Sequence, residues 1–65
     1  MPIVRIEMLS GRSREQKRAL AEAVTRDVAE IAKCTLESVQ VIFTSVDRED
    51  WAIGGRLTLD PPKQG

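Results

Sequence analysis

The sequence predicts an α+β fold built on one β-α-β unit in which the two strands run parallel. Three patterns indicate this: apolar residues that alternate near the start, a helical apolar period in the middle, and a β-branched run after it. A chain of 65 residues has room for one domain, residues 1–65. We expect the crossover from the first strand through the helix to the second strand to be right-handed.

Residues 2–9 are expected to form the first strand. Three apolar residues alternate there with two charged ones: Val4, Ile6 and Met8 against Arg5 and Glu7. One face of the strand is therefore apolar and the other is charged. A Ser-Gly pair follows and ends the strand.

The longest predicted element is a helix over residues 14–33. Ser13, followed three residues later by Gln16, has the capping-box pattern of a helix start. The apolar stripe expected to share one face consists of Leu20, Val24, Val28 and Ile31. Charged residues occupy the outer face, in an order that favours ion pairs four residues apart: Arg14, Glu15, Arg18, Glu22, Arg26 and Glu30.

Residues 39–46 are rich in β-branched and aromatic side chains, which predicts the second strand. A polar loop over residues 47–50 leads to the segment Trp51-Ala-Ile-Gly-Gly55, whose paired glycines indicate a turn. Residues 56–59 are expected to add a short C-terminal strand, and residues 60–65 to form a tail that its prolines keep from being helical.

Such a small unit leaves apolar surface uncovered, since parallel sheets are ordinarily covered on both faces. One helix cannot accommodate all the apolar strand residues that remain: Ile3, Leu9, Ile42 and Val46. The single cysteine, Cys34, excludes an intrachain disulfide, and no metal-ligand spacing is present. We therefore expect an oligomer in which the Trp51 segment is the arm that reaches a neighbouring subunit.

The charge balance and hydropathy exclude several classes of partner. Ten basic and ten acidic residues cancel, so neither nucleic acid nor a membrane is expected to bind. Nothing resembles a signal peptide, and no stretch reaches the roughly 20 apolar residues of a transmembrane helix. We expect a cytoplasmic protein. The chain has no histidine, which excludes Cys-His and Ser-His-Asp sites.

Pro2 is the candidate catalytic residue, because removal of Met1 would leave its nitrogen as a free secondary amine. Such an amine carries a lone pair and can take or give a proton. Since α-amino groups have a pKa of about 8, a base that works at neutral pH needs that pKa lowered by apolar burial or a nearby cation. Many Met-Pro starts have no such role, so the other motifs of the chain decide the interpretation.

Several motifs together resemble the 4-oxalocrotonate tautomerase family over nearly the whole chain. They are Pro2-Ile3 at the start, Gly11-Arg12-Ser13 followed by Glu15-Gln16-Lys17, and Trp51-Ala-Ile-Gly-Gly55. Each motif alone is weak evidence for the family, and the motifs in this order are together specific for it. The resemblance implies the tautomerase β-α-β fold, a homohexamer or in some members a heterohexamer, and no cofactor. It also implies an isomerase that interconverts enol and keto forms of a small carboxylic acid, with Pro2 as acid-base catalyst.

The resemblance further implies three substrate-binding positions. Arg12 matches the family's substrate-binding arginine, and its planar guanidinium suits a carboxylate; apart from the resemblance, it reads as a solvated cation near a helix start. Trp51 matches an aromatic residue that reaches a neighbouring subunit's pocket, and it suits an ordinary core or interface anchor equally well.

Gln40 stands where the enzyme that named the family has a second arginine. Its side chain donates hydrogen bonds without a charge, so we expect a dicarboxylate to be a poor substrate. The cations that would compensate are Arg5, Arg48 and Arg56.

Two other functions stay open at the level of the sequence. In the first, Pro2 stays protonated as a general acid, and a carboxylate activates water for hydration or hydrolytic dehalogenation of an unsaturated acid. The carboxylates available are Glu7, Asp47, Glu49 and Asp50. In the second, the chain is a non-catalytic module for assembly or small-molecule binding.

Overall fold

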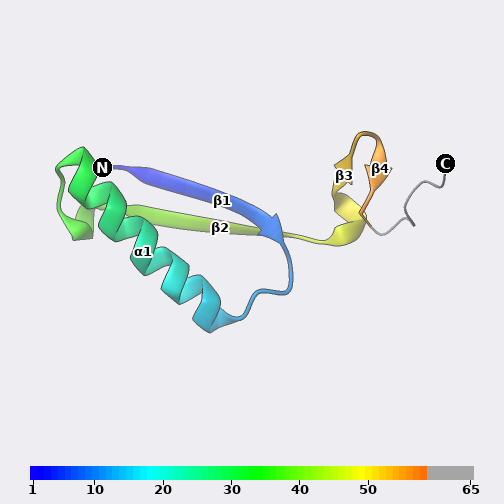
Figure 1. The fold of residues 1–65 in the computed structure, drawn as a ribbon, viewed down its shortest axis with the longest axis horizontal. Helices are drawn as coiled ribbons and strands as arrows, with labels where there is room; N and C mark the ends of the chain where they lie inside the picture. Colours follow the sequence, from blue (N-terminus) through cyan, green and yellow to red (C-terminus); the bar gives the residue numbers. More distant parts are fainter. Residues whose placement is uncertain (59–65) are drawn as a thin grey trace.

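The computed structural model describes residues 1–58, which form a β-α-β unit followed by a small hairpin (Figure 1). Strand β1 (Ile3–Leu9) leads into helix α1 (Arg14–Ala32), the short 3-10 helix η1 (Leu36–Ser38) and strand β2 (Gln40–Val46). A second 3-10 helix, η2 (Arg48–Asp50), precedes strands β3 (Ala52–Ile53) and β4 (Arg56–Leu57). The predicted fold class is confirmed.

Strands β1 and β2 pair in parallel, with Ile3 opposite Gln40 and Leu9 opposite Val46. Side chains alternate between the two faces of a strand, and α1 lies across one face of this sheet (Figure 1). The residues that share the more covered face are Val4, Ile6 and Met8 on β1, beside Val41, Phe43 and Ser45 on β2. The predicted strand ranges 2–9 and 39–46 agree with these bounds to within one residue.

Helix α1 begins with the predicted capping box. The Ser13 hydroxyl accepts the backbone N–H of Gln16 at 3.0 Å, and the Gln16 side-chain oxygen accepts the N–H of Ser13 at 2.9 Å. At the other end, Lys33 has a left-handed backbone with a φ of 59°, which stops the helix. Both ends therefore match the predicted range 14–33 to within one residue.

Two expectations for α1 are wrong. Ile31 is 81% exposed. The face of α1 that is covered is centred on Ala21 and Val28. Since successive residues of a helix are about 100° apart, Leu20 and Ile31 lie at the edge of that face. The expected ion pairs four residues apart are not formed in the described part of the chain. The ion pair present joins Arg26 and Asp27 at 4.0 Å, and both side chains are mostly exposed. Exposed charges gain little from a fixed pair.

The hairpin β3–β4 turns at the two glycines, as predicted. Gly54 and Gly55 have φ values of 62° and 83°, and two positive φ angles in a two-residue loop are typical of a type I′ turn. Thr58 joins the hairpin to η2, since its hydroxyl donates to the Arg48 carbonyl at 2.7 Å. Strand β4 ends at Leu57. Residue 59 of the predicted strand and the predicted tail over residues 60–65 lie outside the described residues.

The chain buries little of its own apolar surface. Its accessible surface is 5412 Å², whereas a compact monomer of this mass exposes roughly 4,100 Å². Its radius of gyration is 15.8 Å, against about 11 Å for a compact chain of this length. Ile3 and Ile42, on the sheet face away from α1, are 50% and 40% exposed. These values agree with the predicted need for a neighbouring subunit.

Residues 1–58 contain no helix with the length and hydropathy that crossing a membrane requires.

Candidate active site

Pro2 and Gln40 lie together at the amino-terminal end of the sheet. The Pro2 carbonyl accepts the backbone N–H of Gln40 at 2.9 Å, and the register places Gln40 beside Ile3. The Gln40 side-chain amide donates to the sulfur of Met1 at 3.2 Å. The structure therefore brings two of the predicted site residues into contact, with the first residue of the chain against them.

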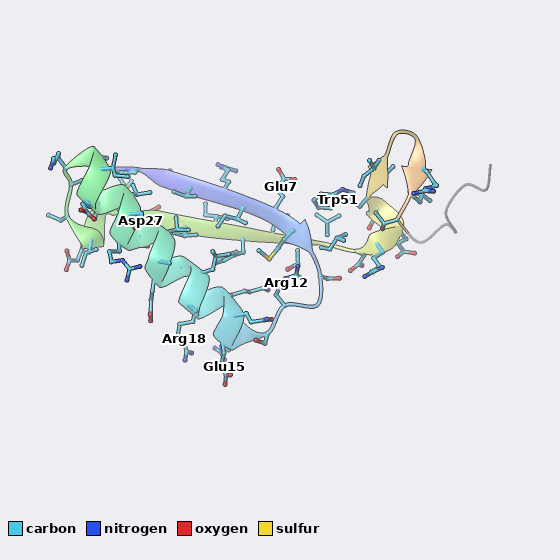
Figure 2. All side chains as sticks on the ribbon, viewed as in Figure 1. Glu7, Arg12, Glu15, Arg18, Asp27 and Trp51 are labelled. Atoms are coloured by element: carbon cyan, nitrogen blue, oxygen red, sulfur yellow. The ribbon has the colours of Figure 1, made fainter. Side chains whose placement is uncertain are left out.

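Arg12 and Trp51 lie at the opposite end of the sheet (Figure 2). Arg12 is in the loop after β1, and Trp51 connects η2 to β3. Trp51 is half-buried and lines a cavity of about 310 Å³ together with Glu7, Val46, Asp50 and Ala52. The hairpin that follows Trp51 extends away from the β-α-β unit (Figure 1).

Strand β1 sets the separation between these two pairs. It has seven residues, and a rise of about 3.3 Å per residue puts its ends roughly 20 Å apart. Pro2 precedes the strand and Arg12 follows it. A single chain therefore does not place all four predicted site residues around one small molecule.

A smaller cavity, of about 140 Å³, lies beside Arg12. Its lining residues are Met8, Arg12, Gln16, Lys17 and Leu20. Sequence reasoning did not assign a role to Lys17. Its place in the Glu15-Gln16-Lys17 motif could have indicated a role. The first turn of α1 brings this motif next to Met8, near the end of β1.

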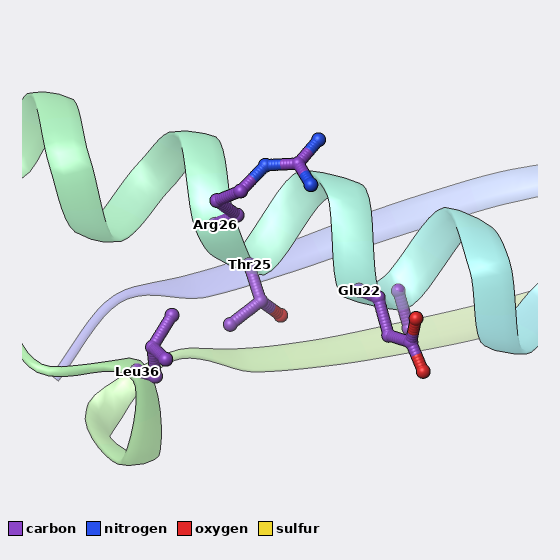
Figure 3. Close-up of a pocket in the computed structure, with 5 residues that line it drawn as sticks. Glu22, Thr25, Arg26 and Leu36 are labelled. Atoms are coloured by element: carbon purple, nitrogen blue, oxygen red, sulfur yellow. The ribbon is translucent and has the colours of Figure 1, made fainter.

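A larger cavity elsewhere on the chain is not lined by any predicted site residue. It measures about 390 Å³ and lies between α1 and η1, lined by Ala21, Glu22, Thr25, Arg26 and Leu36 (Figure 3). The Leu36 side chain is 55% exposed, so this is an open groove on the surface of the chain. Its size alone gives no chemical reason to place the active site there.

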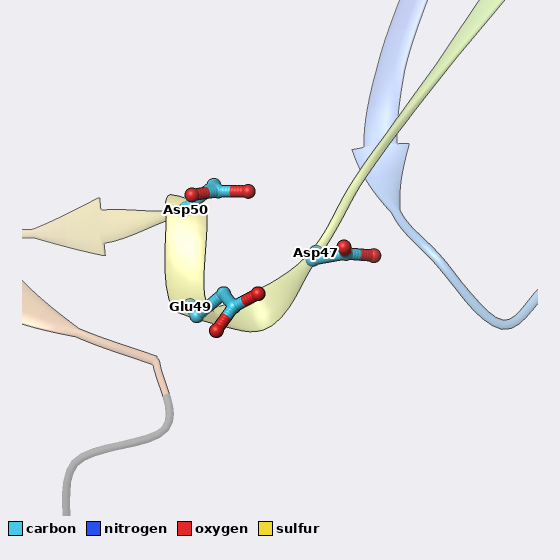
Figure 4. Close-up of side chains that lie close together, drawn as sticks. All are labelled: Asp47, Glu49 and Asp50. Atoms are coloured by element: carbon cyan, nitrogen blue, oxygen red, sulfur yellow. The ribbon is translucent and has the colours of Figure 1, made fainter.

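Three carboxylates gather in η2 and the residue before it (Figure 4). Asp47, Glu49 and Asp50 have carboxylate oxygens that all lie within 4.8 Å of one another, and all three residues are exposed. Asp47 also accepts a hydrogen bond from the Ser10 hydroxyl at 3.2 Å, which ties the two loops at this end of the sheet. Exposed carboxylates often group in this way, so we assign no ligand to the cluster.

Comparisons with known proteins show the family and the fold of the chain. A family model described as "Tautomerase enzyme" matches residues 2–60. The chain is 40% identical over 60 residues to a probable tautomerase of Halalkalibacterium halodurans, with 92% of this chain and 98% of the relative covered. It is 44% identical over 55 residues to a 2-hydroxymuconate tautomerase of Comamonas testosteroni, covering 85% of this chain and 87% of the relative. A heterohexameric 4-oxalocrotonate tautomerase of Chloroflexus aurantiacus superposes with a TM-score of 0.85 at 38% identity, covering 89% of this chain and 94% of the other.

Proposed function

The chain belongs to the tautomerase family and is an isomerase, and we propose that it interconverts the enol and keto forms of a small carboxylic acid with Pro2 as its acid-base catalyst. Removing a proton next to a carbonyl requires a base that is unprotonated near neutral pH. It also requires hydrogen-bond donors where the enolate charge develops. The free amine of Pro2 supplies the base once Met1 has been removed.

The contact between Gln40 and Met1 is the observation that carries this proposal. In the chain with Met1 attached, the Gln40 amide donates to the methionine sulfur at 3.2 Å. Removal of Met1 takes that acceptor away and leaves an amide donor beside the new amino terminus. A substrate oxygen can then accept from Gln40 while Pro2 takes the proton from the adjacent carbon.

The complete site forms between two chains. Arg12 and Trp51 lie at the far end of the sheet from Pro2, roughly 20 Å away along β1. When two copies lie antiparallel, the Pro2 end of each is next to the Arg12 end of the other, so a two-fold pair has two equivalent sites. The apolar residues exposed on the open sheet face, Ile3 and Ile42, supply surface for such contacts.

The preferred substrate is a monocarboxylate. Arg12 binds the carboxylate through its planar guanidinium. Gln40, at the other side of the reacting carbon, is neutral and offers no charge to a second carboxylate. Trp51 instead offers an apolar surface to the rest of the substrate.

The test compares chains with and without Met1. With Met1 attached, the Pro2 nitrogen is an amide and cannot accept a proton, so we expect enol-keto conversion of phenylenolpyruvate only in the processed protein. Intact-mass measurement on each assayed sample gives the processed fraction, and activity is expected to rise in proportion to it. Processed Pro2→Ala protein is the matched control, since it has a primary amine in place of the secondary amine of proline. It is expected to lose most of the activity. Full activity in a wholly unprocessed sample would contradict the role of Pro2.

A second reaction, hydration or dehalogenation of an unsaturated acid, is favoured by one observation. Glu7 and Asp50 line the same cavity as Trp51, so two carboxylates are available there to activate water. In that reaction Pro2 acts as a protonated acid, and the rate falls as pH rises and the amine loses its proton. In tautomerisation Pro2 acts as a base, and the rate rises over the same pH interval. The slope of kcat/KM against pH, measured for both substrate classes, separates the two functions. Absence of turnover for both would favour a non-catalytic module.

A further inference from the structure

The 140 Å³ cavity beside Arg12 has the lining of a carboxylate pocket. Two of its residues, Arg12 and Lys17, are cations, and Met8 and Leu20 supply apolar walls. A water molecule occupies about 30 Å³ in the liquid, so the cavity has room for a carboxylate and the carbon atoms next to it. The Gln16 side-chain oxygen accepts the N–H of Ser13.

Both cations are available to a ligand. Among residues 1–58, neither Arg12 nor Lys17 forms an ion pair with a carboxylate. Asp47, an acid at this end of the sheet, accepts a hydrogen bond from the Ser10 hydroxyl. The lining of this cavity therefore carries two positive charges and no negative one.

Lys17 makes one hydrogen bond to the sheet. It is half-buried, and its ammonium group donates to the Ser45 hydroxyl at 3.3 Å. Ser45 lies opposite Met8 in the sheet, so this hydrogen bond directs the lysine toward the end of β1 where the cavity opens. An ammonium group has three N–H donors, so two remain for a ligand.

We propose that Lys17 is a substrate-binding residue, which together with Arg12 holds the carboxylate of the substrate in this cavity. This inference rests on the proposed function and deepens it, because it assigns the second cation of the site to the same chain as Arg12. Both cations then bind one carboxylate, and the neutral Gln40 of the neighbouring chain meets the other end of the substrate. A monocarboxylate satisfies this arrangement fully.

Binding of benzoate, a monocarboxylate with no enolisable carbon, tests the proposal without turnover. The titration uses the processed, assembled protein and is followed by calorimetry. Loss of one charge-assisted hydrogen bond predicts that Lys17→Met weakens benzoate binding roughly tenfold or more. Lys17→Arg keeps the charge and is expected to stay within about threefold of the wild type. Lys33→Met, at the other end of α1, is the matched control for loss of a lysine charge and is expected to bind as the wild type does.

Ser45→Ala separates binding from a purely structural role. It removes the hydrogen bond to β2 and keeps the ammonium group, so benzoate affinity is expected to change far less than in Lys17→Met. Equal losses in these two variants, or unchanged affinity in Lys17→Met, would overturn the assignment. If Lys17→Met does not assemble, Lys17→Gln replaces it, because glutamine keeps a hydrogen-bond donor and removes the charge. Unchanged benzoate affinity in Lys17→Gln would likewise overturn the assignment. The same titration is repeated in processed Pro2→Ala protein. Benzoate binding there shows whether the carboxylate pocket is present even if Pro2 has no catalytic role.

Discussion

From its resemblance to the 4-oxalocrotonate tautomerase family, the chain is expected to have Gln40 where the enzyme that named the family has a second arginine. The Gln40 amide lies against the first residue of the chain, close enough to donate to the Met1 sulfur. An uncharged donor at this position stabilises a developing oxyanion less than a guanidinium does. Substrate choice is therefore expected to depend on this side chain more than on any other single residue near Pro2.

Gln40→Arg is expected to improve the use of a dicarboxylate. A new charge-assisted contact is worth about 1.5–3 kcal/mol, so the ratio of kcat/KM for 2-hydroxymuconate to that for phenylenolpyruvate should rise about tenfold or more. Steady-state kinetics of both substrates in both proteins measures the ratio. Gln40→Met, which has similar length and no donor, is the control and should slow both substrates. Equal use of the two acids by the native protein would mean that another cation compensates.

At the scale of the element, the start of α1 positions both cations of the proposed carboxylate pocket. Arg12 directly precedes the N-cap Ser13, and Lys17 lies in the first turn of the helix. The reciprocal hydrogen bonds between Ser13 and Gln16 fix where this turn begins. Helix capping therefore contributes to the geometry of the site as well as to stability.

Ser13→Ala is expected to destabilise the protein by about 1 kcal/mol, because the N–H of Gln16 loses its acceptor. Urea unfolding at a fixed protein concentration measures the change, since the stability of an oligomer depends on concentration. Thr35→Ala is the matched control. Thr35 is the N-cap of η1, and its side chain makes no capping hydrogen bond, so its replacement should change stability by less than about 0.5 kcal/mol. Equal effects of the two changes would contradict a capping role for Ser13.

At the scale of the whole molecule, the proposed site needs two chains, because Pro2 and Arg12 lie at opposite ends of β1. This leads to a complementation test. Pro2→Ala and Arg12→Ala proteins should each be nearly inactive, because every site lacks one of the two groups. Unfolding and refolding an equal mixture should restore activity, since about a quarter of randomly formed sites pair an intact Pro2 with an intact Arg12 from another chain. Separately refolded samples mixed afterwards are the control, and no recovery in the co-refolded mixture would place the whole site within one chain.

Trp51→Ala is expected to weaken both assembly and activity. One large aromatic anchor can contribute about 2 kcal/mol or more at an interface, and Trp51 lies on the arm that extends from the β-α-β unit. Sedimentation velocity across a concentration series measures assembly, and kcat/KM at a fully assembled concentration measures the site. Ile53→Ala, on the same hairpin and 69% exposed in the isolated chain, shows how much of the effect belongs to the arm in general. A stable, active monomer of the native protein would contradict the intersubunit site.

The long elements of this fold, β1, α1 and β2, and the turn before β4 follow from local patterns, and the sequence by itself predicted them. It did not predict β3, η1 or η2. The alternation in β1, the capping pair Ser13 and Gln16, and the paired glycines Gly54 and Gly55 each act over a few residues, so their backbone geometry is encoded where they stand. The candidate residues Pro2, Arg12 and Trp51 were proposed from motifs along the chain, and Gln40 from the family resemblance; all four remain predictions.

Only the tertiary structure decided which of these parts meet. Helical periodicity fixes the angles between side chains on α1 without fixing which angle faces the sheet, so Ile31 was expected to be covered and is exposed. The contact of Lys17 with Ser45 joins residues 28 positions apart and depends on how the crossover seats α1 on β2. Contacts between distant segments are set by packing and register, which no local pattern specifies.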